Sequence, residues 1–142
     1  MGFKDRHTGR EFLMLNTHLD NKGVQARTEG AKLITERLIQ LSNGLPVIFT
    51  ADLNRRPDSD VYHLLTETLR DTTHAPKAGH TGPTETFTGW LDDPRPANKQ
   101  AGTIDYILVS PAVGVRWTQT MPSEWGGRQL SDHRALMADL NL

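Results

Sequence analysis

Two apolar, strand-like segments on either side of one amphipathic helix constrain the fold of this chain most. Residues 10–17 and 46–51 are each apolar and extended in pattern. Residues 24–42, between them, have a helical period in which charged residues separate four apolar positions: Ala31, Ile34, Leu38 and Leu41. A strand, a helix and a strand in this order predict a parallel β-strand pair joined by a right-handed crossover.

The rest of the chain continues to alternate strands and helices. Residues 59–69 have a shorter helical period. Between residues 71 and 102 the chain is rich in Gly, Pro, Thr and His, and a loop this long in a compact domain is usually functional or disordered. Three further segments are typical of strands: residues 104–109, 113–118 and 135–140. We therefore expect an α/β protein, with a mixed β-sheet flanked by helices, in a single domain over residues 1–142.

Composition excludes several classes of function. The formal net charge is −1, so no global basic field attracts nucleic acid. The chain contains no cysteine, which rules out disulfides, thiolate metal sites and cysteine nucleophiles. No apolar run approaches the length of about 20 residues that a membrane-spanning helix needs, and no apolar leader precedes the first strand. These features favour a cytoplasmic protein without a membrane span.

Short polar motifs stand next to the predicted strands. Asn16-Thr17-His18 closes the first strand, Asp52-Leu53-Asn54 follows the second, and Ser131-Asp132-His133 precedes the last. Strand ends at one edge of a sheet are where α/β proteins gather side chains for chemistry. Carboxylate, carboxamide and imidazole groups together can bind a hard divalent cation and contact phosphate.

Asp52 and Asn54 occupy alternate positions, so an extended backbone would point both side chains the same way. Such a pair can hold a metal ion, or one member can hold a water while the other contacts a phosphate oxygen. The alternative is a simple turn, because Asp and Asn are common turn residues. His18 has a similar alternative, since a lone histidine at a strand end is usually a surface or capping residue.

His133 requires a carboxylate partner from another strand, because its neighbour Asp132 would face the opposite side of a strand. Asp105 is the best candidate, since it lies among apolar residues where an unpaired charge would be costly. A His–Asp pair fixes the imidazole tautomer and raises its basicity. Acid–base help of this kind contributes about 10²–10⁴ in rate. The alternative is a structural ion pair.

These motifs together resemble the endonuclease/exonuclease/phosphatase family, which is related to DNase I. They occur in one order as Asn16-Thr17-His18-Leu19-Asp20, Ala51-Asp52-Leu53-Asn54, Thr103-Ile104-Asp105-Tyr106-Ile107 and Ser131-Asp132-His133. The resemblance covers the C-terminal portion of that family's domain. It implies about half of a four-layer DNase I-like α/β sandwich, lacking the usual N-terminal portion. The early Asn and Glu that hold the family's catalytic metal have no counterpart in this sequence.

The resemblance implies Mg²⁺- or Mn²⁺-assisted hydrolysis of a phosphodiester or phosphomonoester by in-line attack of water. The substrate would be a small molecule, a lipid head group or a nucleic acid. The resemblance implies that His133 is the general base or a phosphate-activating histidine, oriented by Asp105. It implies that Asp52 and Asn54 position the attacking water, contact the phosphate and bind metal. Asp132 would be a metal ligand, and His18 would contact the phosphate.

A different class of function remains open. A half-sandwich would expose one apolar face of its sheet, and large exposed apolar patches mark association sites. The chain would then be a catalytically deficient phosphate-binding fragment that forms a homodimer or requires a complementing N-terminal half.

Overall fold

The computed structural model of the chain describes residues 1–75, 79–90 and 102–142. It contains two helices and a short 3₁₀ turn, namely α1 (Val24–Ser42), α2 (Asp60–Thr66) and η1 (Thr72–His74). Its strands are β1 (Gly2–Lys4), β2 (Glu11–His18), β3 (Val47–Asp52), β4 (Arg70–Asp71), β5 (Gly79–Thr81), β6 (Asp105–Val109), β7 (Gly114–Thr120), β8 (Glu124–Trp125), β9 (Arg128–Gln129) and β10 (Leu136–Asn141). No helix in these described ranges is long and apolar enough to cross a membrane.

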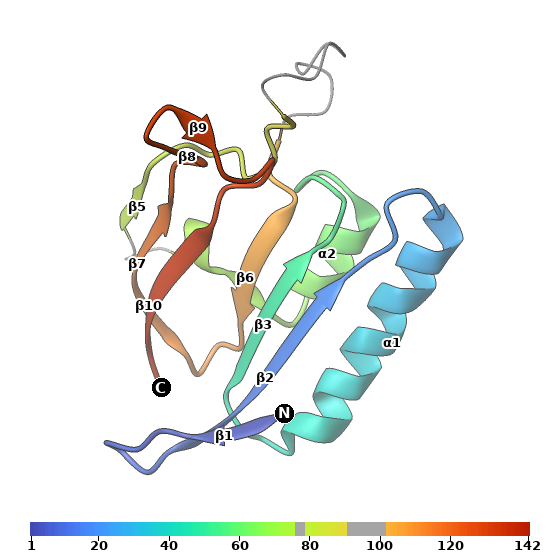
Figure 1. Ribbon diagram of the computed structural model, residues 1–142. Coiled ribbons are helices and arrows are strands. Elements are labelled where there is room, and N and C mark those ends of the chain that lie inside the picture. Colours follow the sequence, from blue (N-terminus) through green and yellow to red (C-terminus); the bar gives the residue numbers. More distant parts are fainter. Residues whose placement is uncertain (76–78, 91–101) are drawn as a thin grey trace.

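The larger sheet has five strands in the order β1-β2-β3-β6-β4. β2 and β3 are parallel and α1 connects them, which confirms the predicted crossover unit, whereas β6 runs antiparallel to β3. A second sheet has the order β10-β7-β5, and β8 and β9 form a hairpin. The carboxyl ends of β2 and β3, the amino end of β6 and the segment before β10 all lie at one end of the molecule (Figure 1).

One face of the larger sheet is packed against both helices. Phe49 of β3 and Leu108 of β6 are fully buried there, as are Ala31 of α1 and Leu65 of α2. Burying a side chain such as Phe or Leu contributes about 1.5–3 kcal/mol. A one-residue slip would turn these side chains outward, so the core fixes the strand register. The register in turn determines which polar residues stand at the strand ends.

Helix α1 differs from the predicted apolar stripe at both ends. Leu41 was expected in the core but is 58% exposed. In the first turn Arg27 is buried, and its Nη1 donates to the Asp20 carbonyl at 2.7 Å.

Other differences from the sequence predictions concern short elements. Five strands of two or three residues were not predicted, because they are too short to have a recognisable period. The helix expected over residues 59–69 ends at Thr66, although Leu69 beyond it is still buried. The stretch between 71 and 102 is not wholly irregular, since it contains η1 and β5. Residues 76–78 and 91–101 of that stretch lie outside the described residues.

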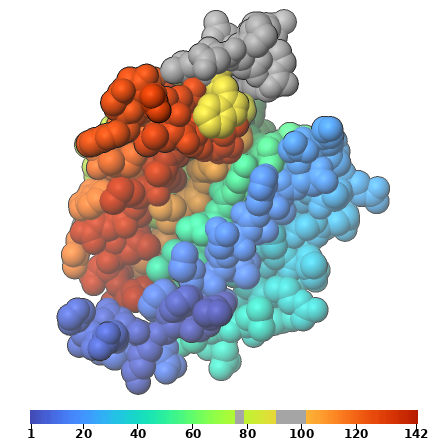
Figure 2. Space-filling model, viewed as in Figure 1, coloured from blue at the N-terminus to red at the C-terminus, as the bar shows by residue number. Residues whose placement is uncertain are grey.

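The opposite face of the larger sheet is covered by neither α1 nor α2. In Figures 1 and 2, β2, β3, β6 and β10 form the front of the molecule, with α2 behind them. The strand register places three rows of residues across β2, β3 and β6 on this side: Met14–Ile48–Val109, Asn16–Thr50–Ile107 and His18–Asp52–Asp105. We call this surface the open face.

Candidate active site

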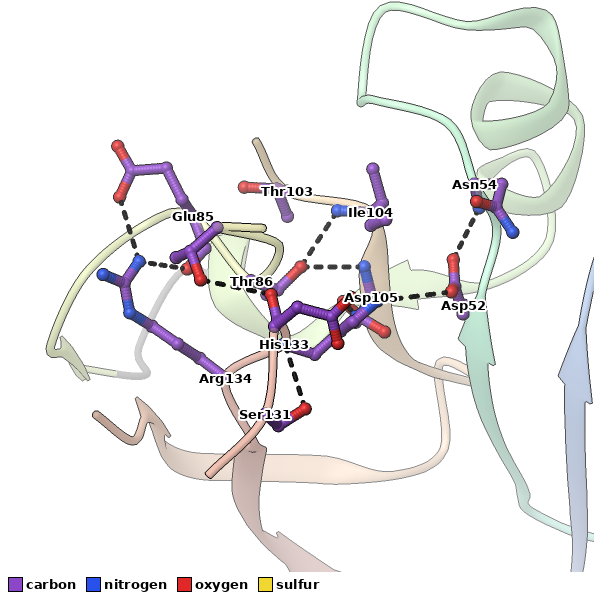
Figure 3. A network of polar contacts seen from close by, with 12 residues as sticks. Asp52, Asn54, Glu85, Thr86, Thr103, Ile104, Asp105, Ser131, His133 and Arg134 are labelled. Atoms are coloured by element: carbon purple, nitrogen blue, oxygen red, sulfur yellow. Dashed lines mark hydrogen bonds and ion pairs between the residues drawn. The ribbon is translucent and has the colours of Figure 1, made fainter. Parts of the chain in front are cut away.

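Three ionisable side chains converge at the strand ends. Asp52 ends β3, Asp105 begins β6, and His133 lies in the segment before β10 (Figure 3). Asp52 and Asp105 are cross-strand partners, and a bridge between Phe87 and His133 places the third segment alongside. One carboxylate or imidazole atom from each of the three residues lies within 4.8 Å of the other two.

His133 and Asp105, predicted to be partners, are in contact. The distance between His133 Nδ1 and Asp105 Oδ2 is 2.8 Å. An Nδ1–H that donates to this carboxylate leaves Nε2 as an acceptor, and Nε2 lies 4.0 Å from Asp52 Oδ2. The ring of Phe87 packs edge-on against the imidazole, with 4.9 Å between ring centres. Asp105 is half-buried rather than enclosed, with 24% of its side chain exposed.

Thr86 forms hydrogen bonds with the backbone of both segments that carry the His133–Asp105 pair, and it was not predicted as a positioning residue. Its buried hydroxyl oxygen accepts hydrogen bonds from the backbone N–H groups of Ile104 and Asp105, both at 3.0 Å. Its carbonyl accepts the N–H of Arg134 at 2.6 Å. Thr86 therefore joins the start of β6 to the segment that carries His133. No periodicity marks a threonine in an irregular segment, so the sequence held no signal for this role.

The Asp52 carboxylate carries a charge that its surroundings do not fully compensate. Burial raises its pKa, and the neighbouring Asp105 acts in the same direction. The N–H of Asn54, which donates to Asp52 Oδ1 at 2.7 Å, opposes this effect, as do His18 and His133. Because the net shift is upward, a cation close to Asp52 would relieve the electrostatic cost of its ionised form.

Asn54 reaches the site by a route that differs from the prediction. β3 ends at Asp52, and Asn54 is left-handed with φ of 51°, a conformation that Asn tolerates better than most residues. The expectation that both side chains project from an extended backbone is therefore wrong. Instead, a turn closed by Asp52 places Asn54 Nδ2 at 2.9 Å from His18 Nε2 and 2.8 Å from the Leu19 carbonyl.

His18 and Asp132 complete the set of predicted residues. His18 Nε2 lies 3.3 Å from Asp52 Oδ2, and 69% of the His18 side chain is exposed. Asp132 does not belong to the three-residue cluster found among the described residues. Asp132 and His133 precede β10, which begins at Leu136, and His133 pairs with Phe87 in an isolated antiparallel bridge.

A hollow of about 850 Å³ lies over these residues. This volume is within the range of about 300–1,000 Å³ of pockets that hold whole small molecules. Five of the six predicted site residues line the hollow, and Asp105 lies behind His133. The lining is formed by His18, Asn21, Lys22, Asp52, Asn54, Arg55, Arg56, Asp58, Ser59, Phe87, Ile104, Asp132 and His133.

Residues 4–133 match the model of the endonuclease/exonuclease/phosphatase family. The chain belongs to this family. The resemblance inferred from the motifs is thereby confirmed, and so is the mixed α/β, DNase I-like fold. The endonuclease/exonuclease/phosphatase family comprises phosphoester hydrolases. No match was found among curated proteins.

Solved structures of family-like proteins superimpose closely on the chain. An endonuclease/exonuclease/phosphatase from Bacteroides vulgatus is 34% identical, with a TM-score of 0.84 over 99% of this chain and 53% of that one. The mannosyl-6-phosphatase of Bacteroides thetaiotaomicron is 28% identical, with a TM-score of 0.84, and the match covers 99% of this chain and 55% of that one. A functionally unknown conserved protein from Enterococcus faecalis is 29% identical, with a TM-score of 0.85, and the match covers 99% of this chain and 54% of that one. The chain therefore spans about half the length of these proteins.

Proposed function

We propose that the chain carries the general-base side of a divalent-metal-dependent phosphoesterase site and hydrolyses a phosphodiester or phosphomonoester by in-line attack of water. One observation carries this proposal: Asp105 holds His133 Nδ1 at 2.8 Å, while His133 Nε2 stands 4.0 Å from Asp52 Oδ2. That gap accommodates one water molecule that hydrogen-bonds to both atoms at the usual distance of about 2.8 Å.

His133 acts on this water as the general base. Asp105 accepts a hydrogen bond from Nδ1–H, which keeps that proton on Nδ1 and leaves Nε2 free to accept a proton. As the water oxygen bonds to phosphorus, its proton passes to Nε2, and the bond from phosphorus to the ester oxygen breaks on the opposite side. Asp52 orients the water through Oδ2. Proton transfer of this kind accounts for about 10²–10⁴ of the rate.

Asn54 and His18 contact the phosphate group. Both side chains line the hollow beside Asp52 and are held together at 2.9 Å. The Leu19 carbonyl accepts a hydrogen bond from the Asn54 amide at 2.8 Å and so fixes its orientation. These contacts support a positioning role, because a phosphate placed over Asp52 would lie within reach of both side chains.

Mg²⁺ or Mn²⁺ fits the donor groups of this chain. Carboxylate and amide oxygens are the preferred ligands of hard divalent cations, and burial and Asp105 raise the pKa of Asp52, so a cation would offset an unfavourable charge. We propose Asp52, Asn54 and Asp132 as the residues that would hold the ion. When bound, it would neutralise negative charge on the phosphate and on the leaving oxygen.

Hydrolysis assays test this proposal. Turnover of bis-p-nitrophenyl phosphate, p-nitrophenyl phosphate and plasmid DNA would be measured with Mg²⁺ or Mn²⁺ for the unmodified chain and for His133→Ala and Asp52→Ala. We expect metal-dependent turnover that falls by at least about 100-fold in each variant. His63→Ala, on the exposed side of α2, serves as the control and should retain full activity. The proposal fails if there is no metal-dependent turnover, or if turnover survives both site substitutions.

The open face favours a second candidate function, in which the chain is a phosphate-binding fragment that needs a partner. The row His18–Asp52–Asp105 lies on this face next to rows that contain the half-buried Met14, Ile48 and Ile107. A layer placed over these apolar residues would also cover the site. The chain spans about half the length of its solved relatives. We therefore propose that residues 1–142 are a partial domain, completed by a second copy or by a complementing N-terminal half.

Sedimentation velocity tests this second candidate. The unmodified chain should self-associate at high concentration, and Ile107→Glu on the open face should shift it toward monomer. Ile39→Glu provides the matched control, because Ile39 is an exposed residue of α1 on the other side of the sheet. A well-folded monomer at high concentration would count against the homodimer. Activity that appears only after an N-terminal half is added would support the complementing chain instead.

A further inference from the structure

The first turn of α1 contains a buried arginine that the proposed chemistry does not use. Only 1% of Arg27 is exposed, and this residue does not line the hollow. Its Nη1 donates to the Asp20 carbonyl at 2.7 Å. Nε and Nη2 are also buried, and neither has a hydrogen-bond partner among the described residues. Arg27 therefore brings a charge into the interior with one side-chain hydrogen bond to compensate it.

This position of Arg27 is unfavourable for folding. A buried charge that is not paired costs free energy, and each buried donor without a partner adds to that cost. Arg27 is also the fourth residue of α1, where the positive end of the helix dipole disfavours a cation. The first turn of α1 contains no acidic residue that would offset this effect. Stability alone therefore does not account for an arginine here.

The carbonyl that Arg27 holds belongs to the turn between β2 and α1. Asp20 closes the same turn with its carboxylate, which accepts the N–H groups of Lys22 and Gly23 at 2.7 and 2.6 Å. Asp20 is thus held through both its carbonyl and its side chain, and these contacts fix its backbone dihedral angles. Because the carbonyl of Leu19 and the nitrogen of Asp20 form one peptide group, they also fix the direction of the Leu19 carbonyl.

The Leu19 carbonyl is in direct contact with the candidate site. It accepts a hydrogen bond from Asn54 Nδ2 at 2.8 Å, and the same nitrogen lies 2.9 Å from His18 Nε2. The Leu19 N–H donates to the Asp52 carbonyl at 2.9 Å. The Leu19 side chain packs closely on α1, since a Cβ on Gly30 would lie 3.3 Å from Leu19 Cδ2. A continuous series of contacts therefore runs from α1 to the amide of Asn54.

The orientation of the Asn54 amide matters for the proposed reaction. Half a turn of this group would exchange its oxygen and its nitrogen, and so exchange an acceptor for a donor. The Leu19 carbonyl can only accept a hydrogen bond, so it selects the orientation in which Nδ2 faces it and Oδ1 points elsewhere. A misplacement of about 1 Å in a positioning group can lower a rate by about 10²-fold. A displaced Leu19 carbonyl would therefore impair the site.

Building on the proposed function, we infer that Arg27 is a positioning residue for the reaction, acting through the turn at Asp20 and the Leu19 carbonyl to orient the Asn54 amide. α1 begins beside the carboxyl end of β2, so Arg27 acts on the site from outside the hollow (Figure 1). The buried charge lowers the stability of the fold, and the structure gains a fixed turn beside the site.

Paired measurements of stability and turnover test this inference. Arg27→Met removes the charge but keeps much of the side-chain volume. In EDTA, its midpoint of urea unfolding should equal or exceed that of the unmodified chain. Its kcat/KM for bis-p-nitrophenyl phosphate with Mn²⁺ should fall by about 10–100-fold. Arg27→Lys keeps a charged donor and should lose less activity. Arg37→Met is the matched control on α1, because Arg37 is exposed and its Nη1 contacts only Gln40 at 3.1 Å; it should change neither quantity.

Two further measurements ask whether Arg27 acts through Asn54. In an Asn54→Ala background, Arg27→Met should cause almost no additional loss of kcat/KM, because the group that it positions is already absent. Nuclear magnetic resonance of the Asn54 side-chain amide gives a readout without turnover. In EDTA, the signals of this amide should shift in Arg27→Met and stay in place in Arg37→Met.

A lower urea midpoint in Arg27→Met, or a failure of this variant to fold, would make Arg27 a structural residue and overturn the inference. Unchanged Asn54 amide signals would overturn it, and so would an undiminished effect of Arg27→Met in the Asn54→Ala background. The inference and the proposed function fail separately. Shifted amide signals in a chain without turnover leave only the positioning of Asn54 standing. Metal-dependent turnover that Arg27→Met leaves intact leaves only the proposed function.

Discussion

Replacing Asp52 by Asn should stabilise the chain when divalent cations are absent. Only 15% of the Asp52 side chain is exposed, burial raises its pKa, and an Asp105 carboxylate oxygen lies within 4.8 Å. At that separation, two charges repel by about 1 kcal/mol in water and by about 3.5 kcal/mol at an effective dielectric constant of about 20. The Asn side chain keeps an oxygen that can accept the N–H of Asn54, so the turn after β3 should be retained.

Urea unfolding followed by circular dichroism measures this effect. At pH 8 in EDTA, the free energy of unfolding of Asp52→Asn should exceed that of the unmodified chain by about 1–3 kcal/mol. Asp139→Asn is the control, because Asp139 forms an exposed pair with Arg116 at 3.5 Å. Its free energy of unfolding should change by less than about 1 kcal/mol.

Excess Mg²⁺ should reverse the order. A cation that binds only the folded chain stabilises it by about 2.7 kcal/mol at 100 times its Kd, and Asp52→Asn should gain much less. A lower free energy of unfolding for Asp52→Asn in EDTA would refute the reasoning. It would mean that the contacts of this carboxylate with Asn54 and the histidines outweigh its desolvation and its repulsion by Asp105.

Three further predictions follow from the same geometry. In EDTA, the difference in free energy of unfolding between Asp52→Asn and the unmodified chain should shrink as the pH falls toward 3.8. The reason is that the pKa of Asp52 in the folded chain is raised above that value, so the folded chain binds this proton at a higher pH than the unfolded chain does. A difference that stays constant in a pH series of unfolding curves would contradict this prediction. The rate of phosphate release should fall by about 10²–10⁴ in His133→Asn, in Asp105→Asn and in the double variant alike, because the two residues act as one unit. A loss in the double variant equal to the product of the two single losses would show that the residues act independently. Asn54→Ala should be less stable than Asn54→Gly by about 1–2 kcal/mol in thermal unfolding, because φ is 51° at this position and a Cβ is strained there; equal stabilities would exclude that strain.

The spacing of apolar residues in the sequence determined the framework of the fold. Residues 10–17, 24–42 and 46–51 predict β2, α1 and β3, and their order predicts the parallel pair. The pairing of His133 with Asp105 was also predictable, because a carboxylate among apolar residues requires a partner. These inferences succeed because strand and helix periods and the cost of burying charge are local properties of a sequence.

Contacts between distant segments decided the rest of the site. Asn54 reaches His18 only through a left-handed turn, and Thr86 joins β6 to the segment of His133 although nothing in the sequence distinguishes it from other threonines. Lys22 and Arg55 both line the hollow, because the loops that carry them follow two adjacent parallel strands, β2 and β3. The sequence alone thus determined the longer strands and α1, and which polar groups lie at their ends. Only the tertiary structure decided how those groups meet, because turn conformation and strand register depend on how the whole core packs.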